Sequence, residues 1–379
     1  MSDIVQIVPY LPPSISGVGD YAFLLAGELR RTQDIHTKFI VCNPKWKPIG
    51  AETEIELDGF PVLQLKNRRA EELKRLLSQP DFPPTVMLQY VGYGYEKRGC
   101  PLWLANALQE WKREKRGSGN GIKRLLIMYH ELYAPGPIWS SSFWNWPFQR
   151  RLVARLARLS SCCFTNRRQS AERLARLVPR HAATIEVFPV FSNFGEPSEI
   201  TPLSRRPSQA VIFGKFGRGI CNRAERWEAI ARVCDYLGIQ KLVIVGGAVT
   251  ELSNYPVKIE CHAVVSALEA SRLLSRSRVG FLDYFDGYLG KSGIFAAFCS
   301  HGVLPVLLAS NSSEPDGLRE NRHFLVASSL EHALPLPRQQ AVAADALQWY
   351  SSHDLSKTAT AIATAIESFM TPSNKPCVD

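Results

Sequence analysis

The sequence has no apolar run long enough to span a lipid bilayer. Its first residues lead directly into a strand-like segment, so we expect no signal peptide and predict a cytoplasmic protein. The nine cysteines include no C-x-x-C pair, which favours reduced core cysteines over disulfides or a zinc site. No Asp-x-Asp cluster of the kind that holds a metal against a nucleotide is present either.

The composition indicates a folded, globular protein. Hydrophobic residues make up 45% and charged residues 21% of a chain of 379 residues, which is long enough for two domains. A net charge of +10 predicts attraction to an anion. Nucleotides, anionic lipid head groups and nucleic acid all qualify.

The N-terminal half alternates strands and helices, which predicts a doubly wound parallel sheet. A buried strand at 4–8 is followed by a loop containing Gly17, Val18 and Gly19 and by an amphipathic helix at 21–31. Only one residue separates these glycines and no third follows, which argues against a nicotinamide dinucleotide site. Further strands are predicted at 37–42, 85–90, 124–129, 161–165 and 184–188, and helices at 70–77, 102–115, 148–159 and 169–177.

The same alternation returns in the C-terminal half. Strands are predicted at 210–213, 242–245, 259–265, 279–281 and 303–308, and helices at 267–275, 294–299 and 341–369. We therefore predict an N-terminal domain at 1–190, a proline-rich linker at 191–208 and a second domain at 209–340. The terminal segment 341–379 is predicted to be helical and able to pack back across both domains.

The stretch from Asp283 to Val306 is the strongest candidate for a binding site. A turn containing Asp286 and Gly287 runs through Lys291, Ser292 and Gly293 into the helix at 294–299. Ser292 can cap this helix or donate a hydrogen bond to the oxygens of a bound anion. A glycine-rich loop that opens a helix presents unpaired N–H groups at the positive end of the helix dipole, which suits a phosphate. The alternative is a tight turn whose lysine is merely solvated.

A second glycine-rich loop, 214–219, follows the strand at 210–213. Gly214 begins it, and Lys215 and Arg218 supply two cations on a flexible backbone. Such cations suit a diphosphate, whose charge they would stabilise as it leaves.

Three features of the first half have alternative interpretations. His130 follows the strand at 124–129, where it can contact a hydroxyl or accept a proton, or simply satisfy a loop carbonyl. The aromatic residues after it suit core packing better than a sugar platform. The arginine-rich segment 149–180 is better explained as a solvated helix face than as a membrane-surface helix, and no nucleic-acid motif is present.

The order and spacing of these motifs resemble GT-B-fold glycosyltransferases, specifically glycosyltransferase family 4, over nearly the whole chain. The resemblance implies that Gly17, Val18 and Gly19 lie near the donor diphosphate. It places His130 near the transferred sugar, and Lys215 and Arg218 against the diphosphate. It also implies that the backbone around Val264 and Val265 reads the nucleobase.

The sequence departs from that family at its carboxylates. The family usually has two glutamates about two helical turns apart. Asp286 with Gly287 stands for the first, and the second falls near Ala296 or Ala297, where there is no carboxylate. Lys291, Ser292 and Gly293 resemble a variant loop of polysaccharide-assembly members.

The resemblance implies a retaining hexosyltransferase of two Rossmann-like domains facing across a cleft, with no cofactor and no required metal. We expect UDP-glucose or a related UDP-hexose as donor and a lipid-linked sugar or polysaccharide, such as an exopolysaccharide, as acceptor. We expect no nucleic-acid partner, and peripheral contact with the anionic inner face of a membrane stays open. The alternatives are a sugar-nucleotide epimerase or phosphorylase of the same fold, and a non-catalytic scaffold that binds a nucleotide sugar.

Overall fold

A computed structural model describes residues 2–48, 55–114, 122–133, 139, 141–214, 223–247, 255–284, 286–310 and 316–368. The chain forms two compact units, one of residues 1–188 with 355–379 and one of residues 189–354. The segment predicted as a linker, 191–208, belongs to the second unit. None of the described helices is long and apolar enough to cross a membrane.

The first unit is built on an eight-stranded sheet in the order β3-β4-β2-β1-β5-β6-β7-β8. Every neighbouring pair is parallel except β3 with β4. The strands are β1 (Ser2–Val8), β2 (Ile35–Val41), β3 (Ile55–Leu57), β4 (Phe60–Gln64), β5 (Thr85–Tyr90), β6 (Arg124–Tyr129), β7 (Cys162–Thr165) and β8 (Ile185–Val187). The helices are α1 (Gly17–Gln33), α2 (Ala70–Leu77), α3 (Gly92–Tyr95), α4 (Leu102–Arg113), α5 (Ser141–Leu159), α6 (Arg168–Leu177) and α11 (Leu355–Ser368), with a 3-10 turn η1 (Pro179–Thr184).

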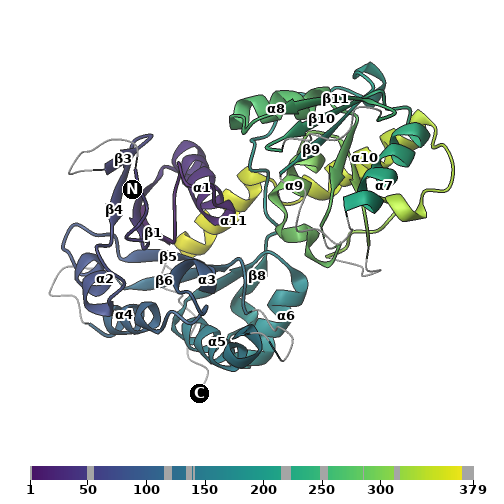
Figure 1. Cartoon of the computed structure of the whole chain (residues 1–379). Helices are drawn as coiled ribbons and strands as arrows, with labels where there is room; N and C mark the ends of the chain where they lie inside the picture. The colour runs from purple at the N-terminus through teal and green to yellow at the C-terminus, as the bar shows by residue number, and fades with distance from the viewer. Residues whose placement is uncertain are drawn as a thin grey trace. The chain divides into compact units, whose positions relative to one another are not determined.

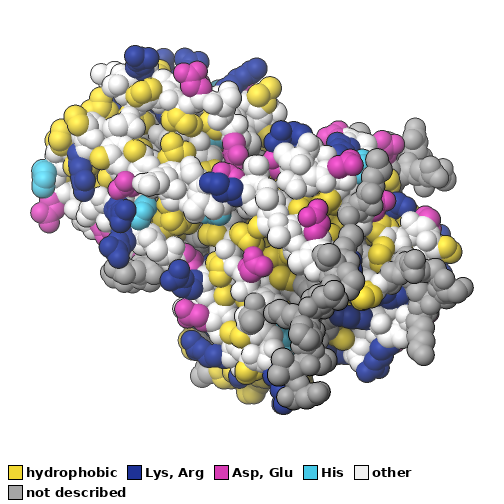
Figure 2. Space-filling model, turned by 180° about the vertical axis from the view of Figure 1, so that it is seen from behind, with side chains coloured by type: hydrophobic (Ala, Val, Ile, Leu, Met, Phe, Trp, Pro, Cys, Tyr) yellow, Lys and Arg dark blue, Asp and Glu magenta, His cyan; other side chains and the backbone are white. Residues whose placement is uncertain are grey.

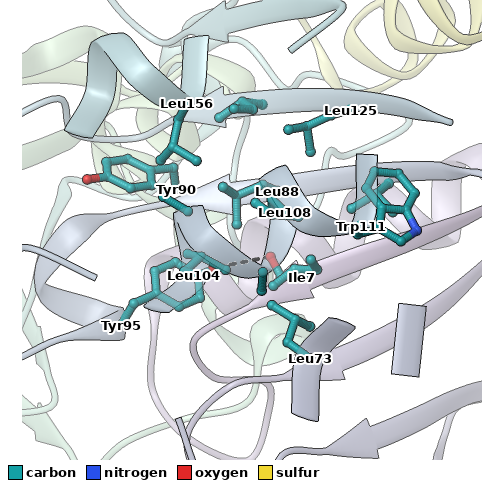
Figure 3. Close-up of a cluster of buried hydrophobic side chains, with 14 of the residues drawn as sticks. Ile7, Leu73, Leu88, Tyr90, Tyr95, Leu104, Leu108, Trp111, Leu125 and Leu156 are labelled. Carbon is teal, nitrogen blue, oxygen red and sulfur yellow. Dashed lines mark hydrogen bonds between the residues drawn. The ribbon is translucent and has the colours of Figure 1, made fainter. Parts of the chain in front are cut away.

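The larger core of this unit lies between one face of the sheet and helices α2, α4 and α5. Figure 3 shows Trp111 and Leu108 of α4 packed against Leu88 and Leu125 of the central strands. The buried hydroxyl of Tyr95 donates to the Ile7 carbonyl oxygen at 3.0 Å, a bond that is also drawn there. This bond ties the segment after β5 to β1, so the carboxyl ends of these strands are held together.

The second unit is built on a six-stranded parallel sheet in the order β11-β10-β9-β12-β13-β14. The strands are β9 (Gln209–Phe213), β10 (Lys241–Val245), β11 (Lys258–His262), β12 (Val279–Leu282), β13 (Leu304–Leu307) and β14 (Leu325–Val326). The helices are α7 (Arg223–Tyr236), α8 (Ala267–Arg276), α9 (Gly293–Ser300) and α10 (Leu336–Tyr350), with 3-10 turns η2 (Leu203–Arg205), η3 (Asp286–Lys291) and η4 (Ala327–Ser329).

The second unit includes a buried arginine in the segment that precedes β9. The Arg206 guanidinium donates to the carbonyl oxygens of Thr201 at 2.8 Å, Ser277 at 2.8 Å and His301 at 2.7 Å. Ser277 and His301 cap the carboxyl ends of α8 and α9, where helices leave carbonyls unpaired and carry partial negative charge. The segment is therefore packed into the unit by its arginine.

The prediction of a single helix at 341–369 is wrong. It is two helices, α10 and α11, separated by residues 351–354. The hydroxyls of Ser351 and Ser352 donate to the carbonyl oxygens of Leu347 and Trp349, both at 2.8 Å. Serine side chains that compete for helix carbonyls favour helix ends. Helix α10 packs on the second unit, whereas α11 lies beside α1 in the first (Figure 1).

Candidate functional site

The carboxyl edge of the first sheet carries a network of buried polar side chains. His130 follows β6, and its Nε2 lies 2.9 Å from Gln89 Oε1 at the end of β5. The Gln89 amide donates to Gln6 Oε1 of β1 at 2.7 Å, and the Gln6 amide donates to the Ala22 carbonyl of α1 at 3.4 Å. Because Gln89 presents its oxygen to the imidazole, Nε2 of His130 is the donor in this arrangement.

The imidazole is also held from its sides. The Tyr21 ring meets it edge-on, with 4.9 Å between centroids, and the Asn166 amide donates to the His130 carbonyl at 3.3 Å. All of these side chains are buried, so their hydrogen bonds fix the ring in one orientation. Such a ring is suited to contact a hydroxyl that reaches this edge of the sheet.

The glycine segment at residues 17–19 is the first turn of α1 and not a loop ahead of it. The helix begins at Gly17 because the Ser16 hydroxyl accepts from the Gly19 N–H at 3.3 Å and caps it there. A Cβ on Gly19 would lie 2.5 Å from the Tyr10 carbonyl oxygen, so only glycine fits this approach. The N–H groups of Gly17 and Val18 are in the first turn, where a helix has no internal acceptors for them.

Asp20 in the same turn is a group that the sequence reasoning did not select. Burial raises the pKa of its carboxyl from an ordinary value of 3.8 to about 6. Its position one residue after the Gly17–Gly19 segment was the available signal. The protein therefore has a carboxyl at this edge that titrates close to neutral pH.

In the second unit, the segment after β12 is the one predicted to bind phosphate, and it consists of η3 and the start of α9. The Ser292 hydroxyl accepts from the Phe295 N–H at 3.2 Å and caps α9, as the sequence predicts. Gly293 is the first helical residue, and a Cβ on it would lie 2.6 Å from the Asn193 amide nitrogen. The positive end of α9 is thus approached closely by a side-chain amide.

Asp286 is buried at the start of η3. One of its carboxylate oxygens accepts from the Gly287 N–H at 2.7 Å and the other from the Ser310 hydroxyl at 2.7 Å. Lys291 at the end of η3 places its ammonium 4.8 Å from the centre of the Tyr288 ring, within cation–π range. Both oxygens of Asp286 therefore shape the loop, and its catalytic role stays a prediction.

Two glycines bring strand ends of the second sheet together. Gly214 follows β9 at φ 95° and Gly246 follows β10 at φ 79°, both in a region that favours glycine. A Cβ on Gly246 would lie 3.9 Å from the Gly214 backbone. Lys215 and Arg218, predicted to contact the diphosphate, lie outside the described residues.

The predicted nucleobase segment lies between β11 and α8. Val264 is 75% exposed and Val265 is half-buried. Their exposure leaves the backbone of this segment accessible on the second unit, and its role stays a prediction.

A buried ion pair at the same sheet edge was also missed. Arg226 of α7 and Asp283, which follows β12, are buried and joined at 2.5 Å. The pair fixes the first turn of α7 to the end of β12, directly ahead of η3.

The structure groups the candidate residues into two sets. Gly17, Val18, Gly19 and His130 lie in the first unit, and Gly214, Val264, Val265, Asp286, Gly287, Lys291, Ser292 and Gly293 lie in the second. Within the described residues, no cluster of three or more histidine, cysteine, aspartate or glutamate side chains could hold a metal. Metal independence remains a prediction.

No family model matches the sequence, and no curated protein matches it significantly. Solved structures do match the fold along its whole length. An alpha-glucosyltransferase in complex with UDP superposes with a TM-score of 0.58 at 10% identity, over 96% of this chain and 100% of that one. The lipopolysaccharide outer core galactosyltransferase WaaB matches with a TM-score of 0.57 at 10% identity, over 97% and 99%.

A third match is a Listeria monocytogenes protein assigned as a UDP-N-acetylglucosamine 2-epimerase, with a TM-score of 0.52 at 13% identity over 99% and 98% of the chains. The alpha-glucosyltransferase has also been solved with UDP and a 13-mer DNA. At such identities the likeness shows the fold. The protein is an α/β protein of two parallel-sheet domains with the GT-B fold, which confirms the predicted fold class.

Proposed function

We propose that this protein is a retaining, metal-independent glycosyltransferase. It transfers a hexose, with UDP-glucose as the first candidate donor, to a lipid-linked sugar or a polysaccharide. The observation that carries the proposal is the capped N-terminus of α9 at the carboxyl edge of a parallel sheet. It occurs in a chain whose fold matches a UDP-bound glucosyltransferase from end to end.

In this proposal the donor diphosphate lies against the second unit. The Gly293 N–H and the Ser292 hydroxyl bind its oxygens, and Lys291, Lys215 and Arg218 add positive charge. As the bond between sugar and phosphate breaks, negative charge grows on the leaving diphosphate. These groups then stabilise the transition state more than the ground state.

In this proposal the first unit contributes contacts to the sugar and the acceptor. His130, oriented by Gln89, contacts a hydroxyl of the transferred sugar or of the acceptor. The first turn of α1, with Gly17 and Val18, lies near the donor. Asp286 acts mainly through the loop that it holds, because both carboxylate oxygens accept hydrogen bonds there.

A thermal-shift panel of UDP, GDP, ADP and their hexose conjugates, with and without magnesium, tests the proposal. A ligand that binds only the folded state raises the unfolding midpoint by mass action. We expect a shift selective for UDP, independent of magnesium and enlarged by one sugar conjugate. If no nucleotide shifts the midpoint, the diphosphate site does not exist.

A pair of variants locates that site on α9. Ser292→Ala removes the cap and should weaken UDP binding by about tenfold, or about 1.4 kcal/mol. Ser300→Ala is the matched control, because it makes the same change in the last turn of the same helix, where the hydroxyl donates to Ala297 O at 3.1 Å. Equal losses of UDP affinity would mean that helix stability, not a phosphate contact, is responsible.

Three alternative functions are compatible with this fold. An epimerase, the activity assigned to one structural match, would change the donor sugar without any acceptor, and a phosphorylase would require inorganic phosphate. A scaffold would bind the donor and neither hydrolyse nor transfer it across an acceptor panel. Product analysis with and without acceptor and phosphate separates all of these from transfer.

A further inference from the structure

A cavity of about 660 Å³ opens in the first unit, beside α5 and the segment 96–100. Its size is that of a site for a small molecule. The segment follows β5 and α3, and α5 is the helix after β6. The cavity is therefore built by the connections at the same sheet edge that carries His130.

The wall of this cavity is fixed by hydrogen bonds. The buried amide of Gln149 donates to the Tyr93 hydroxyl at 3.1 Å and to the Arg98 carbonyl at 3.0 Å. Gly99, which follows Arg98, has φ 69°, and a Cβ there would lie 2.6 Å from the Gln149 amide nitrogen. Residue 99 therefore has no room for a side chain, and this part of the wall is already formed without a ligand.

The lining is largely apolar. Leu102 and Phe148 are 58% and 59% exposed, and the buried Leu152 also lines the cavity. Large apolar side chains exposed together in a concave surface indicate a bound apolar group. Phe148 is the one aromatic residue among the described lining residues, so the cavity offers no row of rings on which bases could stack.

The remaining lining residues are mostly cationic. The lining has one carboxylate, that of Glu96, and four cationic side chains, those of Lys97, Arg98, Arg151 and Arg155. The Arg155 guanidinium is held in place by Gln109 Oε1 at 2.9 Å. On the face shown in Figure 2, by contrast, basic and acidic side chains are interspersed over the surface. The cavity therefore joins an apolar lining to a local excess of positive charge.

An unsatisfied hydroxyl lies next to the cavity wall. Tyr90 is fully buried, and its hydroxyl has no hydrogen-bond partner among the residues that the structure describes. A Cβ on Gly92 would lie 3.3 Å from this hydroxyl and 2.6 Å from the Gly99 carbonyl oxygen, which places it beside the wall. Figure 3 shows the hydroxyl pointing away from the labelled core residues. A buried hydroxyl without a partner is costly, but Tyr90 does not line the cavity and is therefore not part of this binding site.

We propose that this cavity binds a lipid phosphate, with the apolar chain on Leu102, Phe148 and Leu152. The phosphate lies against Arg98, Arg151 and Arg155, since guanidinium groups bind phosphate through paired hydrogen bonds. The proposal rests on the proposed function for one point, that the lipid phosphate is part of the acceptor. Binding itself is measured independently of transfer.

Titration calorimetry of the full chain with decyl phosphate, below its micelle concentration, tests the proposal. Decyl maltoside supplies the same chain without the charge, and inorganic phosphate supplies the charge without the chain. We expect decyl maltoside and inorganic phosphate each to bind at least about tenfold more weakly than decyl phosphate. If inorganic phosphate alone binds as tightly, the site is only an anion site and the proposal fails.

Two variants and a matched control assign the binding to the cavity. Arg151→Glu and Phe148→Asp should each weaken decyl phosphate binding by about tenfold or more. Arg158→Glu makes the same charge change at an exposed position of the same helix outside the lining, and should leave affinity within about twofold. An equal loss in Arg158→Glu would mean diffuse charge attraction and would overturn the assignment.

Two further arms identify the source of the ligand. Vesicles of phosphatidylglycerol that compete fully with decyl phosphate would indicate a membrane head-group surface, and a single-stranded DNA 13-mer that competes would indicate a nucleic-acid groove. Either result overturns the lipid-phosphate acceptor. The UDP thermal shift should be the same in Arg151→Glu as in the parent, because the residues proposed to bind the diphosphate, Lys291, Ser292 and Gly293 among them, lie in the second unit. Loss of lipid binding and loss of donor binding are therefore separate outcomes.

Discussion

Each unit has its candidate residues at the carboxyl edge of a parallel sheet, but the two edges carry different kinds of group. In the first unit, the polar side chains of Gln6, Gln89 and His130 form one buried network. In the second unit, the edge presents a capped helix N-terminus at Ser292 beside the buried ion pair of Arg226 with Asp283. The first arrangement orients an imidazole through hydrogen bonds to amide side chains, whereas the second has the positive end of a helix dipole, which favours an anion. A parallel sheet thus positions groups at this edge without determining their charge.

The largest expected effect comes from breaking the ion pair of the second edge. Asp283→Ala leaves the Arg226 charge buried, which costs about 3–5 kcal/mol in comparable pairs. We expect the second unit to lose about 3 kcal/mol of unfolding free energy, measured by denaturant titration. Hydrogen exchange of peptides then assigns the loss to residues 189–354.

The chain contains its own control for that experiment. Lys241 and Glu260 form a partly exposed pair at 2.6 Å in the same unit, and Glu260→Ala should cost about 1 kcal/mol or less. Adding Arg226→Met to Asp283→Ala should recover part of the loss, because the buried charge is then removed as well. Failure of the second substitution to recover any stability would show that Asp283 acts through other contacts.

The first edge should lose stability when Gln89, which joins Gln6 to His130, is replaced. Gln89→Leu leaves the Gln6 amide oxygen and the His130 N–H without their partner, at a cost of about 2 kcal/mol. Denaturant unfolding measures this cost, and hydrogen exchange should show it in the first unit. Gln33→Ala, which removes an exposed bond to Thr360, should change stability by less than about 0.5 kcal/mol. A cost for Gln89→Leu no larger than this would mean that the network does not hold His130.

The sequence predicted the central strands well because their apolar runs are continuous. Strands β5 and β6 and helix α2 have the predicted bounds, since turn residues and charges flank them closely. The cap at Ser292 was predicted for the same local reason. The start of α1 was placed four residues late because glycine was taken as loop, whereas Ser16 caps the helix before Gly17.

What the sequence did not reveal depends on contacts between distant residues. Gln6 and Gln89 meet only because β1 and β5 are neighbours in the sheet. Arg226 and Asp283 come from different elements, and neither has a local signature. The cavity lined by Phe148 and Leu102 likewise needs two helices placed side by side, so a list of elements could not predict it.

The smallest expected effect concerns Asp20, and it tests whether a charge at the first edge lowers stability. Burial raises the pKa of the Asp20 carboxyl from 3.8 to about 6, so the folded state binds its proton more tightly than the unfolded state does. Stability then falls as pH rises from about 4 to about 6, and the penalty persists above that range. The full shift corresponds to about 3 kcal/mol, but partial exposure and the favourable helix N-terminus reduce it to about 1 kcal/mol.

Asp20→Asn removes the charge and should therefore stabilise the protein by about 1 kcal/mol at pH 7.5, with no gain at pH 4. Thermal unfolding of parent and variant across this range measures the difference. Asp235→Asn makes the same change at an exposed position of the second unit and serves as the control. A gain of equal size at both pH values would mean that the introduced amide stabilises through packing, and the first edge would then tolerate charge as the second does.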